Sequence, residues 1–195
     1  MEERELPRRK HVRLKEYDYS TVGAYFVTIC AKNRRSLFSR SVGRGLAPAE
    51  NNGILMWDGE EELCEVVYTR CGEIAERELL ALEQRYPHVV VDRYVIMPNH
   101  IHAIVMLRDA ECAQTGGLCE QGSAGASPRP TLMDVICSYK SLTVRACKAE
   151  GGTGELFQTS FHEHVIRCEK DYDEIVRYIT ENPMRWRADE LYVAE

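Results

Sequence analysis

The pattern of apolar and polar residues predicts four strands and three helices along this chain. Short apolar runs rich in β-branched and aromatic residues favour strands. The predicted strands cover residues 25–30, 88–95, 100–107 and 161–167. Apolar residues at helical spacing predict helices over residues 60–84, 131–149 and 171–181. This order of elements is typical of an α+β sandwich, with a four-stranded antiparallel sheet and helices on one face.

The length of 195 residues predicts one domain over 1–195. Three segments lie outside its core elements: a basic N-terminal arm over 1–20 and Gly-rich loop insertions over 41–53 and 109–129. No apolar run approaches the roughly 18 residues of a membrane helix, and the first residues are charged. We therefore expect no membrane span, no signal peptide and a cytoplasmic protein. The eight cysteines form no C-x-x-C pair, which favours reduced thiols.

The charge is unevenly distributed along the chain. The net charge is −6, but residues 1–40 carry ten Lys/Arg against five Asp/Glu. Binding to a polyanion depends on local clusters of charge rather than on the total. The acidic balance therefore neither favours nor excludes a nucleic-acid partner.

The triplet His100-Ile101-His102 begins the third predicted strand. Side chains alternate between the faces of a strand, so both histidines point to one face. Their spacing of about 7 Å allows the two imidazoles to share a divalent metal. The alternative, two histidines hydrogen-bonded to backbone or water, stays open at this point.

The last predicted helix places a tyrosine beside its buried stripe. The stripe that must face the sheet consists of Tyr172, Ile175, Val176 and Ile179. Tyr178 lies about 60° to one side of it, and Asn182 lies one turn further along. The two side chains can therefore face the same volume at the edge of the core. Alternatively, Tyr178 packs its ring and extends its hydroxyl into water.

Together these residues suggest phosphoryl-transfer chemistry. A metal on His100 and His102, with Asn182 as an oxygen ligand, leaves coordination positions open for a phosphate. Mixed imidazole and carbonyl ligands suit Mg²⁺ or Mn²⁺, which would polarise the phosphate. The Tyr178 oxygen can then attack phosphorus, forming a phosphotyrosine and expelling a 3′-hydroxyl.

Several motifs, in their order along the chain, resemble one known family. They are Arg8–Lys10, Tyr17–Ser20, Gly23–Cys30, Met97–His102, Ser138–Ser141, Phe157–Gln158, Phe161–Arg167 and Tyr178–Pro183. Over nearly its whole length the chain resembles the REP-associated tyrosine transposases, within the wider single-tyrosine His-hydrophobic-His transposase superfamily.

The resemblance implies a ferredoxin-like nuclease that cuts and rejoins single-stranded DNA near hairpins through a covalent 5′-phosphotyrosine. It implies Tyr178 as the nucleophile and a Mg²⁺ or Mn²⁺ ion on His100 and His102, completed by Asn182. The implied partner is single-stranded DNA with hairpins, bound by a monomer or a homodimer. A related protein that binds hairpins without cutting them is the alternative.

Other residues are candidates for supporting roles. The candidate DNA-binding residues are Arg8, Arg9, Lys10, Arg13, Lys15, Arg34, Arg35, Lys140 and Arg145. His164, in a second His-x-His with His162, could support the metal or contact DNA, or be a structural histidine bonded to backbone. Tyr139 is a rival nucleophile. A hydrolase with a water nucleophile would need a further Asp or His ligand close to the strand, and Asp92 is the nearby acid.

Overall fold

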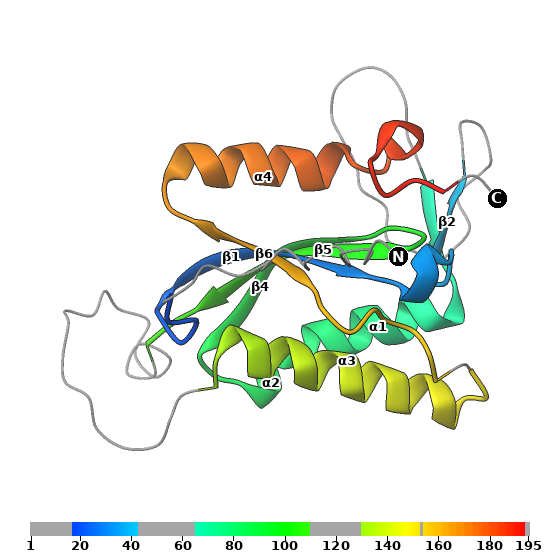
Figure 1. Cartoon of the computed structure of the whole chain (residues 1–195), viewed down its shortest axis with the longest axis horizontal. Helices are drawn as coiled ribbons and strands as arrows, with labels where there is room; N and C mark the ends of the chain where they lie inside the picture. The colour runs from blue at the N-terminus through cyan, green and yellow to red at the C-terminus, as the bar shows by residue number, and fades with distance from the viewer. Residues whose placement is uncertain (1–16, 43–64, 110–129, 153, 194–195) are drawn as a thin grey trace, which may run out of the picture.

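A four-stranded antiparallel sheet forms the centre of the protein, in the order β4-β5-β1-β6 (Figure 1). The computed structural model describes residues 17–42, 65–109, 130–152 and 154–193. The strands are β1 (Gly23–Cys30), β4 (Val89–Ile96), β5 (His100–Leu107) and β6 (His162–Ile166). This sheet confirms the predicted α+β class. Residues 1–16 of the basic arm and most of both predicted insertions lie outside the described residues.

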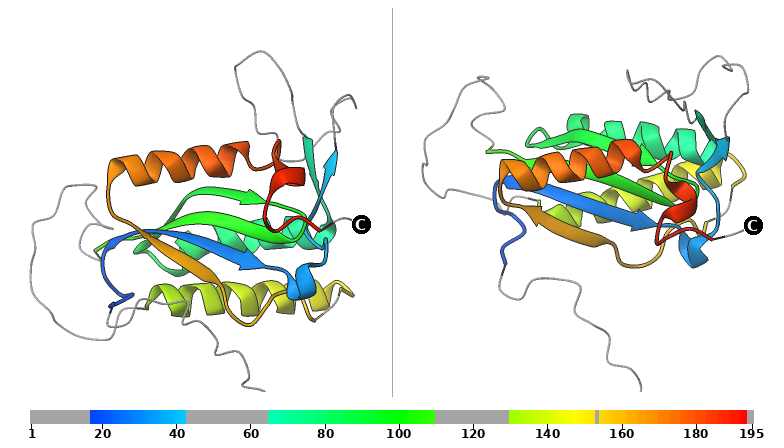
Figure 2. Two further views of the ribbon diagram at one scale, coloured as in Figure 1. Left: turned by 45° about the horizontal axis from the view of Figure 1, so that its top comes forward. Right: turned by 90° about the horizontal axis from the view of Figure 1, so that it is seen from above.

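Helices cover both faces of the sheet, so the expectation of helices on one face is wrong. The helices α1 (Arg70–Leu80), α2 (Leu82–Arg85) and α3 (Leu132–Ala149) lie on one side, and α4 (Glu169–Glu181) lies on the other (Figures 1 and 2). The reason is that β5 is apolar on both faces. Ile101 and Val105 join the core beneath α1 and α3, whereas Ile104 packs in a second core with Ile179 of α4. A strand that is apolar on both sides needs cover on both.

The first predicted helix begins later than expected. Residues Glu65–Tyr68 form β3, which pairs with β2 (Ser39–Val42) in a separate two-stranded sheet. Helix α1 starts after Thr69, whose hydroxyl accepts a hydrogen bond from the Gly72 N–H at 3.1 Å. A side chain at Gly72 would collide with the Phe38 carbonyl, because its Cβ would lie 1.9 Å from that oxygen. Glycine therefore lets α1 approach the segment before β2.

Helix α3 follows the predicted span closely. Thr131 and Asp134 form a capping box at its start. Tyr139 is fully buried between α3 and the sheet, and its hydroxyl donates to the Ala75 carbonyl of α1 at 3.2 Å. Among the described residues, no helix is both long enough and apolar enough to pass through a membrane.

Two short 3₁₀ turns lie at the end of the sheet where β1 finishes and β5 begins (Figure 2). One is Lys32–Arg34, directly after β1, and the other is Trp186–Ala188, after α4. The first contains two consecutive left-handed residues, Asn33 at φ 56° and Arg34 at φ 53°. Such backbone is strained for residues with a side chain. The backbone carbonyl of Arg34 accepts a hydrogen bond at 3.4 Å from the side-chain amide of Asn99, the residue just before the histidine pair.

Candidate active site and metal centre

His100 and His102 lie side by side under α4, as strand alternation predicts. Their ring centroids are 4.4 Å apart, and their side chains are 0% and 2% exposed. Strand β5 places both rings on the face that α4 covers, where Phe26 of β1 stacks on His102 at 5.1 Å. The pair is therefore buried between the sheet and α4.

Hydrogen bonds fix the orientation of both imidazoles. The Asn99 amide donates to the Leu191 carbonyl at 2.7 Å, so its oxygen faces His100 Nδ1 at 2.8 Å. His100 Nδ1 must then carry the proton, and its Nε2 holds a lone pair. That Nε2 is buried and has no hydrogen-bond partner among the described residues. On His102, Nδ1 lies 2.9 Å from the Thr28 hydroxyl, and Nε2 faces the Tyr178 hydroxyl at 3.3 Å.

Asp189 supplies a carboxylate to this pair, and the sequence did not reveal it. One ligand atom from each of His100, His102 and Asp189 lies within 4.8 Å of the others. The 3₁₀ turn after α4 brings Asp189 back over the histidines, and the Leu191 N–H donates to its Oδ1 at 2.6 Å. No periodic pattern marks the residue, because it lies in a short irregular segment.

Tyr178 and Asn182 meet at this cluster, as their helical spacing predicts. The Tyr178 hydroxyl lies 3.3 Å from His102 Nε2 and donates to Asp189 Oδ2 at 3.2 Å. The Asn182 amide donates to the same carboxylate oxygen at 2.8 Å, while its own Oδ1 is buried without a partner among the described residues. Tyr178 itself is 44% exposed, unlike the buried histidines beside it.

The protonation states follow from burial. Burial lowers the pKa of His100 to about 4 and that of His102 well below its ordinary value, so both rings are neutral. Burial and the neighbouring Asp189 carboxylate raise the pKa of Tyr178 to about 12. The phenol therefore keeps its proton at neutral pH unless a cation offsets the negative charge.

These donors fit a divalent cation. Two neutral imidazoles and a carboxylate converge, and the Asn182 amide is bonded to that carboxylate. Two polar atoms, His100 Nε2 and Asn182 Oδ1, are buried without a partner among the described residues. An unsatisfied buried polar atom is costly unless an ion or water meets it. Oxygen and imidazole donors of this kind suit Mg²⁺ or Mn²⁺.

Two other expected participants are placed elsewhere. Tyr139, the rival nucleophile, lies in the core on the opposite face of the sheet, where burial raises the pKa of its phenol. Asp92, the candidate ligand for a hydrolase, accepts a hydrogen bond from the Tyr172 hydroxyl at 2.5 Å and is not in the ligand cluster. The acidic group near the histidines is Asp189 instead.

Lys140 and His164 have local structural partners. The Lys140 ammonium donates to the backbone carbonyls of residues 158–160 at 2.5, 2.9 and 3.4 Å, so it holds that segment rather than facing solvent. His164 Nε2 lies 2.9 Å from Asp171 Oδ2. The side chain that contacts His102 Nδ1 is Thr28, whose hydroxyl lies 2.9 Å away.

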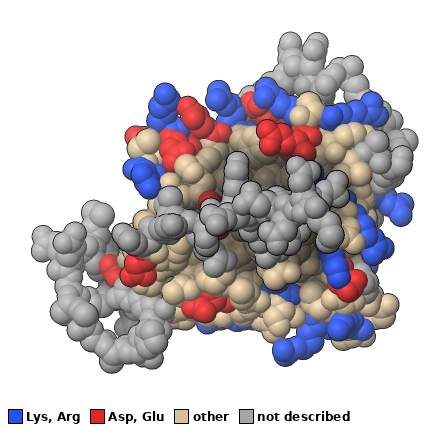
Figure 3. Space-filling model, in the orientation of Figure 1, with Lys and Arg blue, Asp and Glu red and all other residues tan. Residues whose placement is uncertain are grey.

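The basic candidates are dispersed. Arg34 and Arg35 are exposed on the turn after β1, and the charge of Arg34 lies close enough to His100 to contribute to its lowered pKa. Arg145 is exposed on α3, on the other side of the sheet. Arg8, Arg9, Lys10, Arg13 and Lys15 lie outside the described residues. In the view of Figure 3, Lys and Arg side chains gather along the edges of the molecule, interspersed with acidic groups.

Comparisons with known proteins support the fold. No family model matches the chain. An uncharacterised protein of Haemophilus influenzae is 29% identical over 192 residues, which cover 95% of this chain and 93% of that protein. A solved REP-associated tyrosine transposase bound to a REP hairpin has a TM-score of 0.55 and 19% identity, covering 89% of this chain and 73% of that one. A Deinococcus radiodurans structure, provisionally named a transposase, aligns at a TM-score of 0.41 and 14% identity over 88% and 96%.

The likeness to the hairpin-bound transposase shows a shared fold. Both the α+β class and the four-stranded antiparallel sheet are thereby confirmed.

Proposed function

We propose that this chain is a metal-dependent transposase that cuts and rejoins single-stranded DNA near hairpins through a 5′-phosphotyrosine on Tyr178. One observation carries the proposal. The hydroxyl of the half-exposed Tyr178 lies 3.3 Å from His102 Nε2, beside two buried neutral imidazoles, the Asp189 carboxylate and the Asn182 amide. Metal-assisted phosphoryl transfer needs a nucleophile next to groups that can bind a metal ion.

His100, His102 and Asp189 would hold the ion, with Asn182 as the fourth donor. A bound Mg²⁺ or Mn²⁺ supplies a Lewis acid that polarises the phosphate and favours the phenolate. The Tyr178 hydroxyl gives its proton to Asp189 Oδ2, its hydrogen-bond acceptor at 3.2 Å. The phenolate oxygen then bonds to phosphorus, and the 3′-oxygen leaves with the bonding electrons and takes up a proton. Attack by another 3′-hydroxyl reverses the step and rejoins DNA.

The substrate class rests on two supports. The order of motifs along the chain resembles the REP-associated tyrosine transposases, and a structure of that family with the same fold holds a REP hairpin. Arg34 acts electrostatically on His100, and Arg35 follows it on the same exposed turn, so both would contact the DNA backbone there.

A covalent-adduct assay tests the proposal. The protein is incubated with Mn²⁺ and hairpin oligonucleotides carrying single-stranded flanks, labelled at either end, and products are separated on a denaturing gel. The 3′-labelled fragment should migrate with the protein, and the 5′-labelled fragment should be released. Tyr178→Phe should abolish the adduct, and Tyr139→Phe should retain it. An adduct that survives Tyr178→Phe contradicts the proposal.

The second candidate is a metal-dependent hydrolase, which Asp189 favours. Two histidines and one carboxylate can hold a metal with open positions for a water nucleophile. Such an enzyme would cleave DNA without a covalent adduct and would still cleave as Tyr178→Phe. Substrate that is bound but neither cut nor joined would instead indicate a hairpin-binding protein.

A further inference from the structure

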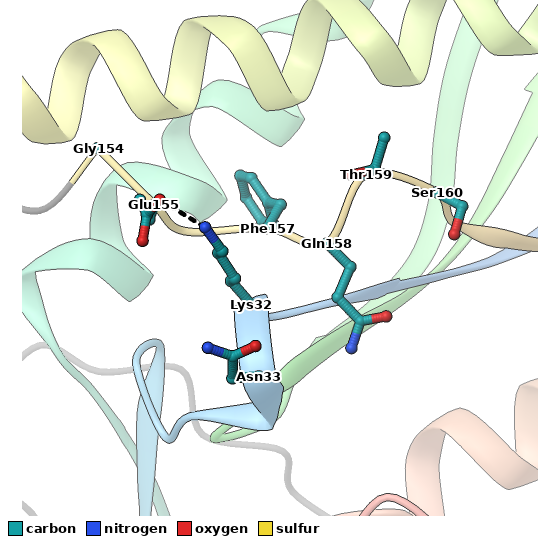
Figure 4. Close-up of a pocket in the computed structure, with 8 residues that line it drawn as sticks. All are labelled: Lys32, Asn33, Gly154, Glu155, Phe157, Gln158, Thr159 and Ser160. Atoms are coloured by element: carbon teal, nitrogen blue, oxygen red, sulfur yellow. Dashed lines mark hydrogen bonds and ion pairs between the residues drawn. The ribbon is translucent and has the colours of Figure 1, made fainter.

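A polar cavity of about 490 Å³ opens beside the end of β1, on the turn that follows it (Figure 4). It is lined by Lys32, Asn33, Gly154, Glu155, Phe157, Gln158, Thr159 and Ser160. Its volume lies within the roughly 300–1,000 Å³ of small-molecule sites. The lining mixes side-chain amides, hydroxyls and one ion pair, which suits a planar polar ligand.

The register of the sheet links this cavity to the histidine pair. Cys30 of β1 pairs with His100 of β5, and the Gln158 N–H donates to the Cys30 carbonyl at 2.9 Å. Ala31 bridges Phe157 in antiparallel fashion, so Gln158 lies opposite Cys30. Residues opposite each other share a face, which places the side chains of Gln158 and His100 on the same side, about 10 Å apart at Cα. Gln158 therefore flanks the proposed cleavage site.

The backbone of Gln158 is fixed while its amide is free. Its N–H is bonded to Cys30, and its carbonyl accepts from the Lys140 ammonium at 2.5 Å. Within the described part of the chain, the side-chain amide has no hydrogen-bond partner. Figure 4 shows it extending toward the side of the cavity where Asn33 lies, while Thr159 points the other way. A free amide on a fixed backbone is preorganised to bind a ligand.

The neighbouring Phe157 shows which half of the Phe157–Gln158 motif is structural. Its ring stacks on Phe38 at 5.4 Å and packs near Tyr139 at 5.8 Å, in the core beneath α3. Gln158 makes no such packing contribution, because it faces the opposite side of the sheet. The motif thus combines a core anchor with a polar group that faces the cavity.

Building on the proposed function, we propose that this cavity binds an unpaired nucleobase next to the cleaved phosphate and that Gln158 hydrogen-bonds its edge. A side-chain amide offers one donor and one acceptor, which complements a base edge with the same pair, as on adenine. Arg34 and Arg35 follow Asn33 on the same turn and are exposed, so they can meet the adjoining phosphates. Gln158 is accordingly a specificity-determining residue.

The test measures binding without cleavage. All variants carry Tyr178→Phe, and fluorescence anisotropy gives the Kd of hairpin oligonucleotides in which each unpaired position is changed through the four bases. The background protein should prefer adenine at one position by about tenfold, within the range for a bidentate amide contact. Gln158→Leu should remove that preference, and Gln158→Glu should shift it toward cytosine, whose amino group donates to a carboxylate. Gln84→Leu, the same change at an exposed position of α2, should alter nothing.

The outcomes separate this inference from the proposed function. A base preference that is unchanged in Gln158→Leu, or no preference at any position, overturns the nucleobase site while binding and adduct formation persist. No binding to any single-stranded hairpin DNA overturns both. Thermal melting of each variant checks that the protein is folded. The Gln158 variants should melt at the temperature of the background protein, because the Gln158 side chain makes no hydrogen bond within the described structure.

Discussion

Acid should destabilise the metal-free protein because two buried histidines stay neutral in the fold. Burial lowers the pKa of His100 from 6.5 to about 4 and lowers that of His102 in the same direction. Between pH 6.5 and about pH 4, the unfolded chain binds a proton at His100 that the folded chain excludes. The free energy of unfolding therefore falls as the pH falls. The His100 contribution is fully present above pH 6.5 and is lost as the pH falls through about 4.

The size of the loss follows from the shift at His100, which is fully buried. One pKa unit corresponds to about 1.4 kcal/mol. Moving from 6.5 to about 4 therefore lowers the free energy of unfolding by about 3 kcal/mol. His102 adds to this loss. Hydrogen-bonded carboxylates such as Asp134 lose their contribution only below their ordinary value of 3.8, under this window.

Urea denaturation in the presence of EDTA, followed by tryptophan fluorescence between about pH 7 and pH 4.5, measures the effect. His100→Gln should reduce the slope of the pH dependence over this range and leave the part that comes from His102. His162→Gln removes an exposed histidine and serves as the matched control, which should keep the slope of the wild type. A wild type equally stable at both ends of the range would refute the account of two buried neutral imidazoles.

Three further predictions concern the metal site and the core. Asp189→Asn should weaken Mn²⁺ binding at least tenfold, measured by calorimetry on the folded protein; unchanged affinity would remove Asp189 from the ligand set. Thr28→Val deletes the hydroxyl that lies 2.9 Å from His102 Nδ1 and should weaken metal binding roughly 10- to 100-fold. Unchanged metal affinity would show that Thr28 does not orient the ring. Tyr139→Phe should cost about 1 kcal/mol in urea denaturation through its lost bond to Ala75 and leave the adduct intact. Loss of the adduct in a folded Tyr139→Phe protein would contradict the placement of the site.

Residues in regular elements were predictable from the sequence. Alternation in β5 placed His100 and His102 on one face, and helical periodicity in α4 placed Tyr178 and Asn182 together beside the buried stripe that includes Ile179. These relations depend only on the geometry of a strand and a helix. They were therefore available before any tertiary contact was known.

Residues in irregular segments were not predictable from the sequence. Asp189 reaches the histidines through a 3₁₀ turn whose path depends on the packing of Trp186 into the second core, between sheet and α4. Likewise, pairing of β2 with β3 interrupts the predicted helix, because β-branched residues such as Val66 take the strand that a partner offers. Apolar residues on both sides of β5 explain why a helix also covers the second face of the sheet. The prediction of helices on one face did not take this pattern into account.

The most direct test of the central claim is to locate the covalent bond. The protein is reacted with a hairpin oligonucleotide and Mn²⁺, the adduct is digested with nuclease and protease, and the peptides are sequenced by tandem mass spectrometry. We predict a nucleotide phosphate on the tyrosine of the α4 peptide at Tyr178. A nucleotide on any other residue, or cleaved DNA with only unmodified Tyr178, would contradict the claim.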